Sequence, residues 1–205
     1  MPTITRSNDL PAEFAVFTVE PERQAALVEQ VIARIETTLQ TQPGFVAGIV
    51  HRSRDGLRVT SYLQWASAAH YIASQPLADF APPDAHLFEI FGEEPTGSVL
   101  KPFAGMAGLI NFGIFKLKRP ENQPRFVELF QQALGLVGHQ PGLITTQAHR
   151  SLDGWRCINY GHWTSLEEFT AMDSNRPFAP LFGEMLDLAD NEYQKTLHEV
   201  IFTTS

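Results

Sequence analysis

The hydrophobic positions change their spacing along the chain, and this change predicts alternating helices and strands. In residues 27–39 apolar side chains recur every three or four positions, which places them on one face of a helix. Residues 45–52 and 57–65 are instead rich in β-branched and aromatic side chains and flank Asp55-Gly56. Because a tight turn needs a positive φ, Asp-Gly between two such runs is typical of a β-hairpin.

The full pattern predicts one order of elements that occurs twice. The first half is expected to contain a strand, a helix, a hairpin of two strands, a short helix and a last strand, at residues 13–19, 21–39, 45–52, 57–65, 67–74 and 86–91. The second half is expected to repeat that order at residues 109–118, 123–137, 143–150, 155–163, 165–172 and 197–203, with an additional helical turn within 176–188. The order β-α-β-β-α-β is that of a ferredoxin-like unit.

The two halves also share sequence. Residues 42–67 and 140–165 align without gaps at an offset of 98 positions, and 12 of the 26 aligned residues are identical. The identities are Gln42/Gln140, Pro43/Pro141, Gly44/Gly142, His51/His149, Arg52/Arg150, Ser53/Ser151, Asp55/Asp153, Gly56/Gly154, Arg58/Arg156, Tyr62/Tyr160, Trp65/Trp163 and Ser67/Ser165. An internal repeat of this kind predicts a duplicated domain, with halves 1–95 and 106–205 joined by a linker at 96–105.

A single ferredoxin-like unit leaves one face of its sheet uncovered by helices. Since that face is apolar here, a second sheet is expected to cover it. We therefore predict an α+β protein in which two ferredoxin-like βαββαβ repeats pack sheet against sheet as an intrachain dimeric α+β barrel, with the helices outside. The chain would be a pseudo-dimer, and whether it pairs again as a homodimer is left open.

Composition narrows the classes of partner. The 205 residues carry a net charge of −8 without a basic cluster, so neither nucleic acid nor a membrane is expected as a partner. The single cysteine, Cys157, excludes an intrachain disulfide, and the first residues lack the apolar run of a signal peptide. These features predict a cytoplasmic protein. The seven histidines are spread without the spacing of metal ligands, so no metal site is expected.

Two side chains of the second hairpin, one polar and one aromatic, could take part in catalysis. Strand alternation places Asn159 and Trp163 on one face together with Gly161, where the first half has Leu63. An amide N–H₂ can stabilise a developing enolate oxygen, and an indole provides a flat wall for a ring. The smaller Gly161 predicts room for a ligand. Alternatively, Asn159 is a hydrogen-bonding residue at the end of the strand, and Trp163 is a residue of the hydrophobic core.

The motif Tyr-x-x-Trp-x-Ser lies at the end of each hairpin, at residues 62–67 and 160–165. With the hairpins, it makes each half resemble the antibiotic biosynthesis monooxygenase family of dimeric α+β barrels. That family includes cofactor-free oxygenases that convert anthrones and hydroquinones into quinones, relatives that degrade haem, and members without known activity. The resemblance implies a monooxygenase that needs no cofactor and oxidises a small aromatic, polyketide-like substrate with dioxygen. The alternatives are a non-catalytic ligand-binding or scaffold barrel and a haem-binding or haem-degrading relative.

The resemblance also implies site residues. In the anthrone-type oxygenases an Asn-Tyr-x-x-Trp segment lines the cavity, with a histidine on the preceding strand. The second half has this set, whereas the first half has Ser61 in place of the asparagine, so the site is expected in the second half. Phe169 and Arg176 are candidates for the family's further tyrosine and arginine. The expected catalytic residues are Asn159, Trp163 and His149, and the expected substrate-binding residues are Tyr160, Phe169, Arg176, Trp65 and Tyr62.

The position of His149 is open on the sequence alone. A two-residue turn at Asp153-Gly154 pairs His149 with Ile158, on the strand face away from Asn159. A β-bulge that shifts the register would bring His149 and Asn159 together.

Overall fold

The computed structural model describes residues 1–74, 85–175, 178–192 and 196–205. The first half contains β1 (Ala12–Thr18), α1 (Gln24–Thr37), β2 (Phe45–Ser53), β3 (Arg58–Trp65), α2 (Ala68–Ser74) and β4 (His86–Glu94). The second half contains β5 (Leu109–Leu117), α3 (Gln123–Val137), β6 (Leu143–Ser151), β7 (Arg156–Trp163), α4 (Leu166–Asn175), α5 (Ala179–Leu188), β8 (Ala189–Asn191) and β9 (Leu197–Thr204). Short 3₁₀ turns, Pro21–Arg23 and Pro120–Asn122, lead into α1 and α3.

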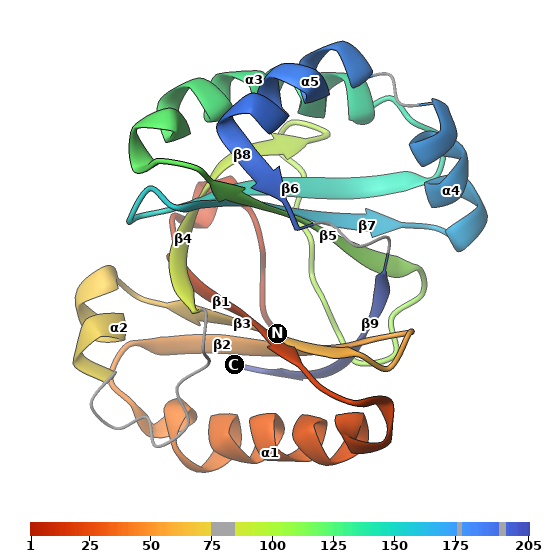
Figure 1. Ribbon diagram of the computed structural model, residues 1–205. Coiled ribbons are helices and arrows are strands. Elements are labelled where there is room, and N and C mark those ends of the chain that lie inside the picture. Colours follow the sequence, from red (N-terminus) through yellow and green to blue (C-terminus); the bar gives the residue numbers. More distant parts are fainter. Residues whose placement is uncertain (75–84, 176–177, 193–195) are drawn as a thin grey trace.

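Antiparallel strands from both halves close into one barrel. Among the described residues, the order around it is β7-β6-β4-β1-β3-β2-β9-β5, and β5 pairs back to β7. Each half supplies four neighbouring strands, β4-β1-β3-β2 and β9-β5-β7-β6. The last strand of each half also pairs with the second strand of the other half, β4 with β6 and β9 with β2. The predicted fold, two ferredoxin-like sheets packed face to face, is confirmed (Figure 1).

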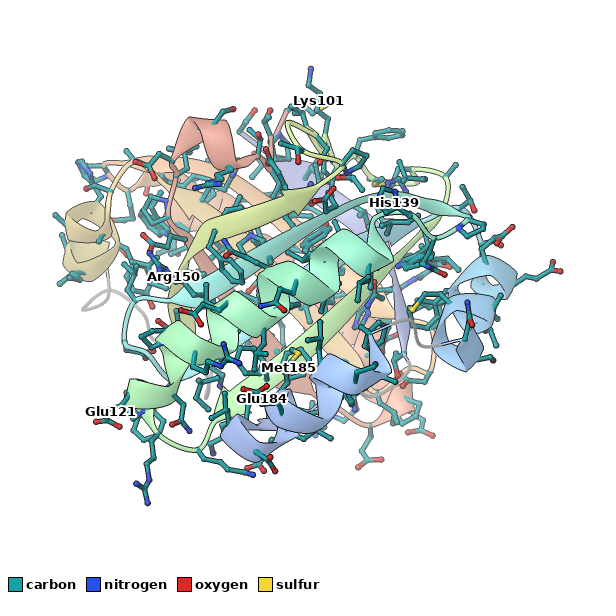
Figure 2. All side chains as sticks on the ribbon, turned by 90° about the horizontal axis from the view of Figure 1, so that it is seen from above. Lys101, Glu121, His139, Arg150, Glu184 and Met185 are labelled. Carbon is teal, nitrogen blue, oxygen red and sulfur yellow. The ribbon has the colours of Figure 1, made fainter. Side chains whose placement is uncertain are left out.

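The helices cover the outer faces of the two sheets (Figure 1). The buried stripe of α1 carries Val31 and Ile35 and packs with Phe17 and Val50 of the sheet beneath it. In the second half α3 and α5 lie side by side over the sheet, with α4 beyond one end of them (Figure 2). The helix α5 is the additional helix predicted within 176–188, and it has no counterpart among the described residues of the first half.

The barrel interior is closely filled by side chains from both halves. This cluster includes Phe14, Tyr62, Phe88, Phe112 and Tyr160, all of them buried. The rings of Tyr62 and Tyr160, which are equivalent in the repeat, meet edge to face with centroids 5.8 Å apart. The apolar faces that a single ferredoxin-like unit would expose are therefore buried against each other within one chain.

The connection between the halves is tied to the start of the chain. β4 ends at Glu94 and β5 begins at Leu109. Between them, Leu100 forms an isolated antiparallel bridge with Ile4, with N–H to O distances of 2.8 and 3.0 Å. No helix in the described part of the chain has the length and apolar character needed to cross a membrane.

The hairpin turns explain four of the twelve identities of the repeat. Each loop has four residues rather than the predicted two, and its glycine has a φ of +81° at Gly56 and +83° at Gly154. In the second turn the hydroxyl of Ser151 donates to the carboxylate of Asp153, 2.6 Å away, and accepts the Arg156 N–H at 2.8 Å. Ser53, Asp55 and Arg58 repeat this pattern.

Replacing the turn glycines is expected to destabilise the fold. Gly154→Val and Gly56→Val should each lower the free energy of unfolding by about 1–3 kcal/mol, because a β-branched side chain is strained at positive φ. At Gly154 an added Cβ would also stand 3.0 Å from the Cβ of Pro120. Urea or thermal unfolding measures the change. Leu152→Val is the matched control, since Leu152 is half-exposed in the same turn. Glycine variants with the stability of the control would show that these turns carry no strain.

Candidate functional site

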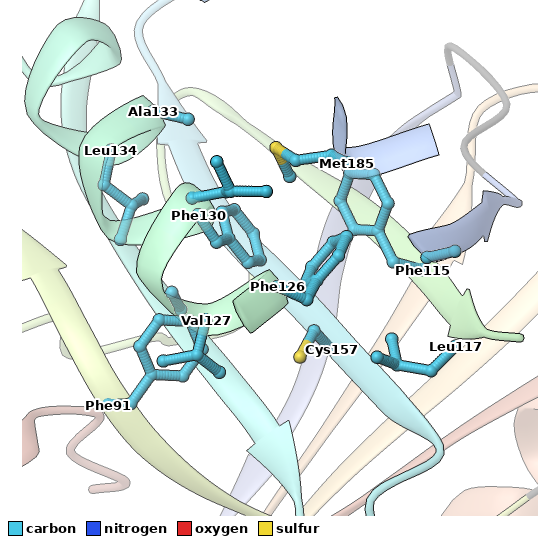
Figure 3. Packing of buried hydrophobic residues seen from close by; sticks show 13 residues of the cluster. Phe91, Phe115, Leu117, Phe126, Val127, Phe130, Ala133, Leu134, Cys157 and Met185 are labelled. Atoms are coloured by element: carbon cyan, nitrogen blue, oxygen red, sulfur yellow. The ribbon is translucent and has the colours of Figure 1, made fainter. Parts of the chain in front are cut away.

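An apolar cavity of about 280 Å³ lies on the outer face of the second-half sheet, beneath α3, α4 and α5. Its walls include Phe115, Phe130, Leu134 and Met185, which gather between α3 and the sheet (Figure 3). Its polar lining consists of three asparagines, Asn111, Asn159 and Asn191. No charged or titratable side chain is among its described lining residues, so the cavity suits a neutral, flat ligand that carries hydrogen-bonding oxygens.

Asn159 presents a defined end of its amide to the cavity. It is half-buried on β7, and the hydroxyl of Thr146 on the neighbouring β6 donates a short hydrogen bond to its Oδ1. Because the oxygen is taken by Thr146, the N–H₂ group is the part of this amide that can donate to a ligand. An oriented N–H donor in an apolar site is what stabilises a developing oxyanion.

Trp163 forms a second wall of the cavity and is itself held in place. Its indole Nε1–H donates to the Oδ1 of Asn111, 2.9 Å away, and its ring meets Phe169 edge to face at 5.6 Å. The side chain of Trp163 is buried, with 1% of its surface exposed. The indole therefore has a fixed orientation, and one flat ring can stack or lie edge-on against it.

Gly161 has a different role from the one expected. It pairs directly with Asn111 across β5 and β7, and a Cβ at position 161 would stand 2.2 Å from the Oδ1 of Asn111. The space above Gly161 is thus filled by the Asn111 amide, not reserved for a ligand. The glycine permits the hydrogen bond between Asn111 and Trp163, and the expectation of ligand room at this residue is corrected accordingly.

Gly161→Ala should therefore disturb the site without touching a ligand directly. We expect the free energy of unfolding to fall by about 1–3 kcal/mol, because the added methyl group must displace the Asn111 amide from Trp163. Tryptophan fluorescence and thermal unfolding measure this. Gly135→Ala on α3 is the matched control, since outside its chain neighbours and the backbone of its own helix nothing lies within 4 Å of the added Cβ. A Gly161 variant that behaves like the Gly135 variant would show that Asn111 moves freely.

His149 lies in the barrel interior, away from Asn159. The pairing of β6 and β7 places it opposite Ile158, the register that the turn position predicts, and the irregularity of β6 lies earlier, between Leu143 and Thr145. The Nε2 of His149 is 3.0 Å from the hydroxyl of Tyr62. Burial lowers the pKa of His149 to about 3, so its imidazole is neutral at ordinary pH.

The repeat places an equivalent pair beside the first. Here the His51 Nε2 is 2.6 Å from the hydroxyl of Tyr160, and burial likewise lowers the pKa of His51 to about 3. Each half thus supplies a histidine to the tyrosine of the other half. Tyr62, Tyr160 and His149, all expected at the site, are brought together inside the barrel and not in the outer-face cavity.

The first half has its own tryptophan in a more filled setting. Trp65 is fully buried on the outer face of its sheet, edge to face with Phe45 at 5.6 Å. At the offset of the repeat, Ile35 and Leu63 stand where the second half has Ala133 and Gly161, and both belong to the core cluster under α1. Of the expected residues, the outer-face cavity therefore collects Asn159, Trp163 and Phe169. Arg176 lies outside the described residues.

Several lining residues were not expected from the sequence. They are Asn111, Asn191, Met172 and Met185, from β5, β8, α4 and α5. The signal for Asn111 was present, because it is the polar interruption of an apolar strand. In the described part of the chain, no group of three or more His, Cys, Asp or Glu side chains is placed to hold a metal ion.

Comparison with known proteins agrees with this architecture. Residues 12–81 match the family model described as antibiotic biosynthesis monooxygenase. The chain is also 41% identical over 73 residues to the tetracenomycin-F1 monooxygenase of Streptomyces glaucescens. That match covers 36% of this chain and 65% of the relative, so slightly less than two thirds of the relative's length. Residues 12–81 are thus similar in sequence to an antibiotic biosynthesis monooxygenase domain.

Solved structures show the same fold across nearly the whole chain. An anthrone oxidase-like protein superposes with a TM-score of 0.81 at 18% identity, covering 100% of this chain and 96% of its own. A putative monooxygenase from Fusobacterium nucleatum gives a TM-score of 0.63 at 7% identity, covering 96% and 94%. At these identities the likeness is one of fold.

Proposed function

We propose that the second half is a cofactor-independent monooxygenase site that oxidises an aromatic, polyketide-like substrate of the anthrone or hydroquinone class to a quinone. One observation carries the proposal: the N–H₂ of Asn159 and the fixed ring of Trp163 line the same uncharged apolar cavity. The family match of the first half and the relative named tetracenomycin-F1 monooxygenase support a monooxygenase-type activity.

The chemistry balances without an external reductant. An anthrone loses a proton from its ring CH₂ group, and the resulting enolate is an electron-rich carbanion. One electron passes to dioxygen, the two radicals combine into a carbon–oxygen bond, and the peroxide anion takes up a proton. Loss of water from this hydroperoxide leaves the quinone carbonyl. The CH₂ group and O₂ thus become C=O and H₂O, with one oxygen atom retained in the product.

The residues of the cavity have separate parts in this reaction. The Asn159 N–H₂ stabilises the enolate oxygen as its charge develops, which lowers the pKa of the CH₂ group on the opposite side of the central ring. Trp163, Phe169 and Phe130 hold the ring system flat and exclude water, so the donor acts in a medium of low dielectric. Because no described lining residue titrates, the proton leaves to a water molecule or to an already ionised phenol of the substrate.

The interior histidines have another role in this proposal. His149 and His51 bond to tyrosine hydroxyls of the opposite half and join the two sheets. For that reason we assign them, with Tyr62 and Tyr160, to the scaffold. A haem-degrading activity would need an imidazole directed at the cavity, and these two are directed into the barrel.

Oxygen consumption with dithranol, measured with a chelator and without flavin, tests the proposal. We expect one O₂ consumed for each 1,8-dihydroxyanthraquinone formed. Ala133→Ile, which gives the cavity wall the residue of the first half, should remove most of this activity. Gln132→Ile, on the exposed face of the same helix, should not. Rates no higher than buffer for dithranol and for reduced naphthoquinones would reject the enzyme and favour a non-catalytic ligand-binding barrel.

A further inference from the structure

A second cavity, of about 400 Å³, opens on the opposite side of the sheets, at the mouth of the barrel. Both halves build it. Its apolar walls are Phe14, Val16, Phe88, Ile114 and Ile158. Its polar lining includes Arg58, Arg156 and Glu192. This barrel-mouth cavity shares no described lining residue with the outer-face cavity, so it is a separate place for a ligand.

The two arginines are the repeat's own pair. Arg58 is the first residue of β3 and Arg156 the first residue of β7, and they are identical in the two copies of the motif. The two turns position them in the same way. The backbone N–H of each arginine donates to the hydroxyl of the serine five residues earlier, Ser53 or Ser151, at 2.8 Å. The barrel brings their guanidinium groups, 98 positions apart in sequence, to one cavity.

Arg156 is a buried cation that has a carboxylate beside it. Its side chain is 7% exposed and forms an ion pair with Glu192, whose own side chain is 42% exposed. The Nε of Arg156 also donates to the Nε2 of His86 at 3.4 Å. A buried guanidinium is stable only where an anion compensates it. The carboxylate of Glu192, which follows the short strand β8, supplies that anion.

Arg58 is compensated more loosely. The carboxylate of Asp55 is 3.6 Å from its Nη1, longer than a charge-assisted hydrogen bond of roughly 2.7–2.9 Å. That carboxylate is already held by the Ser53 hydroxyl at 2.6 Å and the Thr196 hydroxyl at 2.7 Å. Glu192 also lines a small adjoining cavity together with Arg58. The side chain of Glu192 is therefore paired with Arg156 and lines the same two cavities as Arg58.

We propose that the barrel-mouth cavity binds an amphipathic carboxylate, with its apolar body against Phe14, Phe88 and Ile158 and its carboxylate at Arg58 and Arg156 in place of the Glu192 side chain. The half-exposed Glu192 can leave toward solvent, whereas the buried Arg156 cannot. An anion that arrives with its own apolar body fills the cavity and compensates both arginines. At about 30 Å³ for each methylene, a volume of about 400 Å³ holds roughly 13 carbons, so a ten-carbon chain fits.

Isothermal titration with decanoate tests this inference, with decan-1-ol as the uncharged probe of equal length. The wild-type protein should bind decanoate with a Kd on the order of 10 μM and decan-1-ol at least about tenfold more weakly. Glu192→Gln removes the competing carboxylate and should tighten decanoate binding about tenfold. It should leave binding of the alcohol unchanged. Arg58→Gln should weaken decanoate binding about tenfold.

Thermal unfolding with and without decanoate separates an effect on binding from damage to the fold caused by the substitution. Decanoate should raise the melting temperature of the Glu192→Gln variant more than that of the wild type, because the ligand binds the variant more tightly. Ala133→Ile, in the outer-face cavity, should leave decanoate binding unchanged. Equal binding of acid and alcohol, weaker or unchanged decanoate binding after Glu192→Gln, or loss of binding after Ala133→Ile would each overturn the inference.

Discussion

Asn159→Ala is expected to lower kcat/KM for dithranol oxidation by about 10²-fold, because the variant loses the oriented donor to the enolate oxygen. The loss should appear mainly in kcat, since the donor interacts more strongly with the charged transition state than with the neutral substrate. Thr146→Val should reproduce part of this loss. It removes the hydroxyl that orients the amide of Asn159, while the amide itself remains.

The first half supplies the matched control for this experiment. Ser61 occupies the equivalent position of the repeat, and it is buried. Ser61→Ala should therefore change kcat/KM by less than about twofold, since removing a hydroxyl far from the cavity leaves the donor of Asn159 in place. Equal losses from Asn159→Ala and Ser61→Ala, measured on folded protein, would mean that both halves share the reaction and that the assignment to the second half is wrong.

Acid is expected to unfold the protein well above the pH at which carboxylates titrate. Burial lowers the pKa of His51 and His149 to about 3 and that of His198 to about 4, against 6.5 for an exposed imidazole. Between these values the unfolded chain binds protons that the folded barrel does not. Stability from these groups is therefore fully present above pH 6.5 and is lost as the pH falls toward 4.

The size of this effect follows from the proton count. Each histidine costs about 1.4 kcal/mol per pH unit below 6.5, hence about 3 kcal/mol at pH 4.5 and roughly 8 kcal/mol for the three together. This is comparable to the whole stability of a typical domain. Urea unfolding at a series of pH values between 7 and 4.5 measures the slope. A double variant, His51→Gln with His149→Gln, should keep about one third of it. If the slope of the wild-type unfolding free energy against pH corresponds to less than one proton taken up on unfolding, the buried imidazoles are charged in the folded barrel and the prediction is wrong.

The local features of this structure, namely its turns and the pairing of neighbouring strands, could be predicted from the sequence. The Asp-Gly dipeptides located both turns, and the turn at Gly154 set the register that pairs His149 with Ile158. Strand alternation then placed Asn159 and Trp163 on one face, where the structure has them. These conclusions depend on residues within about ten positions of each other, where turn geometry and alternation decide the result.

The contacts between residues far apart in the sequence could not be predicted in the same way. A repeat shows that His51, His149, Tyr62 and Tyr160 are equivalent in pairs, but not that each histidine bonds to the tyrosine of the other half. That exchange results from β4 and β9, which each pair with a strand of the opposite half. The outer-face cavity likewise needs α5, a helix without a counterpart among the described residues of the first half. Asn111 stood out only as a polar residue in an apolar strand until its pairing with Gly161 was known.

The most direct test of the central claim is a crystal structure with the product 1,8-dihydroxyanthraquinone bound. The account predicts the quinone in the outer-face cavity of the second half, with its rings against Trp163 and Phe169. One carbonyl oxygen should lie within hydrogen-bond distance of the Asn159 Nδ2, roughly 2.7–3.2 Å. Quinone bound only at the barrel mouth, or on the first-half sheet beside Trp65, would contradict it.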